Sequence, residues 1–110
     1  ITGLTIGEVM EDSDAWVCAS RCAQEAYNVA IAKNINVRIS DPIDYVLNFG
    51  SKIPNAKPSM LLDALAGGMS EIDAINGAIP IAGKEVNVQT PFNSAISALV
   101  RSKEKQVGVR

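Results

Sequence analysis

Apolar residues along this chain recur every three or four positions, which is the spacing of amphipathic helices. The longest such stretch predicts a helix from about Asp14 to Lys33, with Asp12 or Ser13 as its cap. Asn34 follows it, and asparagine readily takes the left-handed conformation that ends helices. The apolar positions form one broad stripe, made of Ala15, Trp16, Ala19, Cys22, Ala23, Ala26, Tyr27, Ala30 and Ile31.

Prolines and glycines mark the next two predicted helices. The Asp41-Pro42 pair is a cap followed by a proline, a typical start for a second helix, which Gly50 would end or loosen. A linker with two prolines follows at residues 54–58. A short third helix is predicted from Ser59 to Ala66, where the Gly67-Gly68 pair breaks it.

The rest of the chain predicts two more helices. Ser70 is expected to cap a fourth helix that begins with the acids Glu71 and Asp73, although Pro80 should kink or end it. Thr90-Pro91 repeats the cap-and-proline start, and the last helix is expected to run to about Lys105. The alternation in residues 35–39 is too isolated for a sheet and indicates an extended linker. The predicted fold class is therefore all-α, an irregular bundle of about five helices.

Composition narrows the possible functions. The 110 residues make one domain with a net charge of −2, which gives no electrostatic basis for binding nucleic acid. No apolar run is long enough to span a bilayer and no signal peptide is present, so a cytoplasmic protein without a membrane partner is expected. The start at Ile1 rather than Met suggests a fragment of a longer protein.

Metal and redox chemistry have little support in the sequence. There is no histidine, so any proton chemistry must use a carboxylate, a lysine or a tyrosine. Cys18 and Cys22 are too few for a zinc site, and we expect them to be buried free thiols. No metal site is predicted.

Two residues at helix starts carry the candidate chemistry, and each has a structural alternative. Glu71 is either a first-turn acid that stabilises its helix, which spacing alone favours, or a carboxylate directed into a cleft. Ser59 is either an N-cap or a hydroxyl that helps to hold an anionic substrate group. No glycine-rich dinucleotide fingerprint is present, so the chain alone should not hold a nicotinamide cofactor at the usual pyrophosphate site.

Two segments resemble one known family. Lys57–Asp63 reads Lys-Pro-Ser-Met-Leu-Leu-Asp, and Ser70–Gly77 reads Ser-Glu-Ile-Asp-Ala-Ile-Asn-Gly. Together with Val88–Pro91, they resemble the C-terminal domain of the ketopantoate reductase (2-dehydropantoate 2-reductase) family. The resemblance covers nearly the whole chain and is sharpest between Lys57 and Asn93.

The resemblance implies an activity and an arrangement of domains. Members of this family reduce ketopantoate to pantoate with NADPH, on the way to pantothenate and coenzyme A. They bind the substrate in a cleft between an N-terminal Rossmann domain and a helical domain with a fold like the C-terminal domain of 6-phosphogluconate dehydrogenase. Residues 1–110 would be that single helical domain. The Rossmann domain, which binds most of the NADP, and the catalytic lysine would precede it.

The resemblance also implies roles for individual residues. Glu71 would be the catalytic and the cofactor-binding candidate, in contact with substrate and cofactor, and Ser59 would bind substrate. An asparagine that some members place three residues before the serine falls at Ala56 here, which leaves Asn55 one position off as a substrate-binding candidate.

Two classes of function are kept open. In the first, the chain is half of an NADPH-dependent reductase of ketopantoate or of another 2-oxo acid, and Glu71 and Ser59 line one exposed groove. In the second, it is a non-catalytic binding or oligomerisation module in which both side chains fold back as caps. Alanine-rich faces and a hydrophobic last helix make a homodimer a reasonable expectation in either class.

Overall fold

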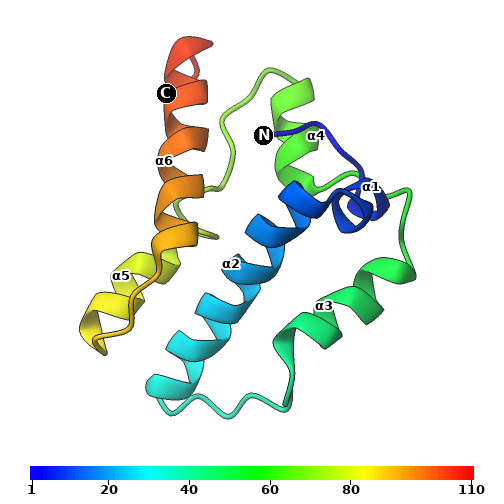
Figure 1. The fold of residues 1–110 in the computed structure, drawn as a ribbon. Helices are drawn as coiled ribbons and strands as arrows, with labels where there is room; N and C mark the ends of the chain where they lie inside the picture. Colours follow the sequence, from blue (N-terminus) through cyan, green and yellow to red (C-terminus); the bar gives the residue numbers. More distant parts are fainter.

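The computed structural model describes all 110 residues and contains six helices and no strand. They are α1 (Ile6–Glu11), α2 (Ser13–Ala32), α3 (Pro42–Ser51), α4 (Ser59–Leu65), α5 (Ala78–Glu85) and α6 (Pro91–Gln106). The long α2 crosses the centre and packs against α1, α3, α5 and α6 (Figure 1). By contrast, α4 stands apart and comes close to none of the other helices. The all-α class is confirmed.

Local capping explains most of the helix boundaries. The Asp12 carboxylate accepts hydrogen bonds from the amides of Asp14 and Ala15, and the Asp41 carboxylate caps α3 in the same way. Asn34 has a φ of 59°, so the predicted left-handed stop after α2 is confirmed. Residues 35–39 form no strand and run as the expected linker.

The first helix, α1, was not predicted. Thr5 and Glu8 form a capping box: the Thr5 hydroxyl accepts the Glu8 amide at 3.3 Å, and the Glu8 carboxylate accepts the Thr5 amide at 3.0 Å. The next two amides of the helix, those of Ile6 and Gly7, donate to the carbonyls of Ala56 and Pro54. Therefore α1 holds the linker that leads into α4.

Gly50 was expected to end or loosen its helix, and α3 does end only one residue after it. Gly50 lies inside α3, which continues to Ser51, and it is buried. A β-carbon at this position would lie 2.6 Å from the sulfur of Met10 in α1. Gly50 therefore serves to let α1 and α3 approach each other closely.

The prediction of a fourth helix starting at Ser70 is wrong. Residues 71–77 form irregular turns, and α5 begins only at Ala78. Pro80 accounts for this, because it then falls in the first helical turn, where backbone amides have no partner within the helix. The Asn76 carbonyl, which a helical Pro80 would have left without a donor, accepts the Ile79 amide at 3.2 Å.

Few residues are buried in this bundle. Only 12 of the 110 residues are buried, and only Val29 and Ile72 among them are large apolar side chains. Large apolar side chains are exposed on most of the helices, including Phe49, Leu65, Ile81 and Leu99. Exposed apolar surface on this scale is typical of protein that packs against a further domain or subunit.

We expect Gly83→Ala to destabilise the protein by about 1–3 kcal/mol, although alanine favours helix. A β-carbon there would lie 2.6 Å from the Val88 carbonyl oxygen, which is backbone and cannot move aside alone. Chemical denaturation would measure the change. The control is Gly68→Ala, where the nearest atom would be 3.7 Å away and stability should hardly change. Equal stability of the two variants would contradict the prediction.

Candidate functional site

Glu71 lies on the segment of residues 70–77, here named the Glu71 turn, which connects the loop after α4 to α5. It is exposed, and its carboxylate takes part in no hydrogen bond or ion pair. The residue after it, Ile72, is completely buried and anchors the turn. Glu71 is therefore not a first-turn helix acid, and its side chain is free to meet a ligand.

The residues around Glu71 are bonded to the C-terminal end of α6. Ser70 was expected to cap a helix, but it does not. Its hydroxyl and its amide both donate hydrogen bonds to the carboxylate of Glu104. Asp73 accepts hydrogen bonds from Arg101 and Arg110, each at 2.8 Å. The hydrogen bond from Arg110, followed by that from Arg101, holds the pKa of the exposed Asp73 carboxyl below its usual value. Asp73 is therefore ion-paired rather than simply solvated.

Ser59 and Asn55 lie on exposed backbone around the start of α4. Ser59 is the first residue of the helix, Pro58 occupies the N-cap position, and no side chain caps the helix. The N-cap interpretation of Ser59 is therefore wrong, and its hydroxyl is uncommitted. Asn55 lies between Pro54 and Ala56, whose carbonyls are bonded to α1, so the backbone on both sides of it is fixed.

A buried network that the sequence analysis missed joins α2, α6 and the Glu71 turn. Glu25 in α2 accepts the backbone amides of Phe92 and Asn93 at 2.8 and 2.9 Å, and the side-chain amide of Asn93 at 2.8 Å. The Asn93 side-chain oxygen in turn accepts the Asn76 side chain at 2.9 Å. Glu25 is therefore the cap of α6 in place of Thr90, whose side chain forms no capping bond.

A cavity lies between α2, α6 and the segments that carry the candidate residues. Its volume is about 590 Å³, and ten of its fourteen lining residues are hydrophobic. Met60, which follows Ser59, and Asn76 of the Glu71 turn both line it, together with Cys18 and Cys22 of α2. Neither this cavity nor the smaller one between α5 and the start of α6 is lined by Glu71, Ser59 or Asn55. The two motif segments thus meet across this space through their neighbouring residues.

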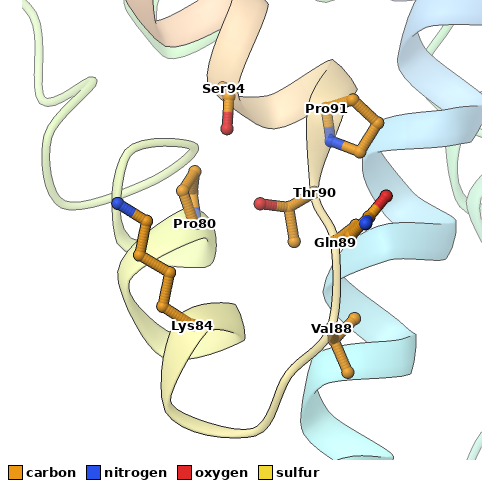
Figure 2. A pocket seen from close by; sticks show the side chains of 7 residues that line it. All are labelled: Pro80, Lys84, Val88, Gln89, Thr90, Pro91 and Ser94. Atoms are coloured by element: carbon orange, nitrogen blue, oxygen red, sulfur yellow. The ribbon is translucent and has the colours of Figure 1, made fainter.

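A smaller cavity of about 300 Å³ lies between α5 and the start of α6. Figure 2 shows the hydroxyls of Thr90 and Ser94 pointing into it, whereas the amide of Gln89 points away. It contains none of the candidate residues. No group of three or more side chains of the metal-binding types is placed to hold a metal ion. No helix is both long and apolar enough to cross a bilayer.

We expect the Cys22 thiol to react slowly. Both cysteines are free and only half-buried, and burial, reinforced by the nearby Glu25 and Cys18, raises the pKa of Cys22 to about 11. Because the thiolate is the nucleophile, alkylation in a Cys18→Ser variant, which lacks the smaller contribution of Cys18, should reach half its maximal rate well above pH 9 when folded and near pH 9 in urea. The same midpoint in both states would contradict this.

Comparison with known proteins places the chain in a family. The family model described as "Ketopantoate reductase PanE/ApbA C terminal" matches residues 1–104. The 2-dehydropantoate 2-reductase of Pyrobaculum aerophilum is 33% identical over 98 residues, which are 89% of this chain and 35% of that protein. Its namesake from Streptococcus pyogenes serotype M1 is 28% identical over 107 residues, 96% of this chain and 35% of that protein. The chain thus spans about a third of the length of these curated relatives.

Solved structures share the fold of this chain. A ternary structure of D-mandelate dehydrogenase with NADH and anilino(oxo)acetate matches 97% of this chain and 60% of its own, with a TM-score of 0.84 and 28% identity. A dimeric ketopantoate reductase from Staphylococcus aureus matches 96% of this chain and 37% of its own, with a TM-score of 0.79. At 21% identity, this second likeness shows the fold alone. The chain belongs to the ketopantoate reductase family, as a C-terminal helical domain of that family.

Proposed function

We propose that residues 1–110 are the substrate-side domain of an NADPH-dependent reductase that converts 2-dehydropantoate to pantoate, in the pathway to pantothenate and coenzyme A. The observation that carries this proposal is the state of Glu71 and Ser59. Both side chains are exposed and uncommitted, whereas a structural module would use them as caps. The name shared by the curated relatives supports the substrate.

The residues of this chain bind and orient the substrate in this proposal. Glu71 contacts the substrate near the cofactor, and the Ser59 hydroxyl, with Asn55 nearby, holds its carboxylate or hydroxyl groups. The nicotinamide supplies the hydride that reduces the substrate carbonyl, and a lysine upstream of this chain supplies the proton.

The cofactor would be held mainly outside this domain. The chain has no glycine-rich phosphate loop, and the free amides at the start of α6 are already bonded to the Glu25 carboxylate. A pyrophosphate group therefore has no place at that helix end. We propose that an N-terminal Rossmann domain of the longer protein binds NADP, with Glu71 reaching the reactive end. A cytoplasmic homodimer completes the proposal, and the dimeric relative from Staphylococcus aureus supports that assembly.

Reduction of a different 2-oxo acid is the second candidate. It is favoured by the likeness to D-mandelate dehydrogenase, whose structure contains NADH and anilino(oxo)acetate.

The test follows NADPH and NADH oxidation by the full-length protein with 2-dehydropantoate and with a panel of aliphatic and aromatic 2-oxo acids. Preferred turnover of 2-dehydropantoate with NADPH is the expected result. Turnover of another acid alone would keep the chemistry and replace the substrate. No oxidation of either cofactor with any acid would favour a binding or oligomerisation module.

A further inference from the structure

We propose that Glu104 is a positioning residue for Glu71, an inference that rests on the proposed function. Glu104 lies near the C-terminal end of α6, and both of its carboxylate oxygens are directed at Ser70, the residue before Glu71. It does not reach the reacting groups. Its proposed role is to fix the backbone from which Glu71 projects.

The geometry at Ser70 leaves that backbone little freedom. The Ser70 hydroxyl donates to Oε1 of Glu104 at 2.7 Å, and its backbone amide donates to Oε2 at 3.2 Å. Two bonds from one residue to the two oxygens of one carboxylate fix orientation as well as distance. The Glu104 side chain is itself only 9% exposed, so water competes little for these bonds.

A second connection fixes the other side of Glu71. Arg110 pairs with Oδ2 of Asp73 at 2.8 Å and lies 3.5 Å from Oε2 of Glu104. Arg101 reaches the other oxygen of Asp73. The residue before Glu71 and the residue two after it are therefore bonded to the same end of α6, and the buried Ile72 lies between them.

Helix stability alone does not favour a buried acid in this place. The last turn of a helix carries a partial negative charge, so an anionic side chain there is electrostatically unfavourable. The only cation paired with Glu104 is Arg110, and the only hydrogen bonds that its carboxylate accepts come from Ser70. The structure therefore indicates that the carboxylate of Glu104 determines the position of Ser70.

The experiment is a double-mutant cycle in the full-length protein, with 2-dehydropantoate and NADPH as probes. In Glu104→Ala, both acceptors of the Ser70 bonds are lost. We expect kcat to fall by about 10- to 100-fold, because small displacements of a catalytic group are costly. KM for NADPH should not change. Glu85→Ala, which removes a surface ion pair with Lys33, is the matched control.

The second arm asks whether Glu104 acts through Glu71. If it does, Glu104→Ala should be silent in a Glu71→Gln background, so that the double variant matches Glu71→Gln within about twofold. Multiplying losses would indicate a merely structural role and overturn the proposal, as would full activity of Glu104→Ala or of Glu71→Gln. A wild-type protein that does not turn over 2-dehydropantoate would refute the proposed function instead, so the two failures are distinguishable.

A milder pair of variants covers a failure of Glu104→Ala to fold. Ser70→Ala removes the 2.7 Å hydroxyl bond but keeps the amide bond, so kcat should fall about three- to tenfold. Ser70→Thr keeps the hydroxyl and should restore at least half of the wild-type kcat. Equal activity of the alanine and threonine variants would overturn the proposal.

Discussion

Changing Glu71 to Gln in the full-length protein should lower kcat/KM for 2-dehydropantoate by about 100-fold or more, the usual size of the effect when a catalytic carboxylate is lost. The folded state should not suffer, because the carboxylate is exposed and bonded to nothing within the chain. The thermal midpoint should therefore remain that of the wild type. Steady-state kinetics and a thermal melt on one preparation measure both quantities.

The control for this experiment is Asp73→Asn, a change in the same turn. It weakens the ion pairs with Arg101 and Arg110 and so should affect stability more than Glu71→Gln does. Its activity should fall less. Unchanged kcat/KM in Glu71→Gln would remove Glu71 from the catalytic machinery.

Changing Glu25 to Ala should destabilise the fold by about 3 kcal/mol, through the loss of a helix cap and of a buried acceptor for three donors, of which only the Asn93 side-chain amide keeps another acceptor, the Cys22 carbonyl. The affected donors are the backbone amides of Phe92 and Asn93 and the side-chain amide of Asn93. Asn93 is 2% exposed, so water cannot easily replace the carboxylate. Urea unfolding of the variant and the wild type measures the loss.

Two further variants sharpen the interpretation of that loss. Glu25→Gln keeps the shape but places a donor against one of these amides, and it should cost nearly as much as Ala. Glu11→Ala changes an exposed acid at the end of α1 and should cost under about 0.5 kcal/mol. A Glu25→Ala protein as stable as the Glu11→Ala control would show that solvent replaces the cap.

Local chemistry made much of the fold predictable. Asp12 and Asp41 cap the helices they were expected to cap, because a capping bond needs only the two or three residues that follow. The Thr5–Glu8 pair has the spacing of a capping box, so α1 could have been found from the sequence in the same way.

Two of the wrong predictions involve bonds between distant residues. Ser70 has the chemistry of a cap, but its partner is Glu104, 34 positions away. Thr90 also looks like a cap, yet Glu25 takes that role from 67 positions away. No local pattern signals such partners. Glu71 and Ser59 became candidates through the family resemblance rather than through periodicity, and their roles stay predictions.

The distant cap of α6 also has a consequence for how the chain folds. During synthesis, Glu25 emerges nearly seventy residues before the amides that it accepts. Until those amides exist, the Glu25 carboxylate stays in water, because burying it without hydrogen-bond donors would be costly. Closing so long a segment costs chain entropy before any bond forms. The domain should therefore acquire its native packing in one late step, after α6 is made, rather than helix by helix as the chain grows.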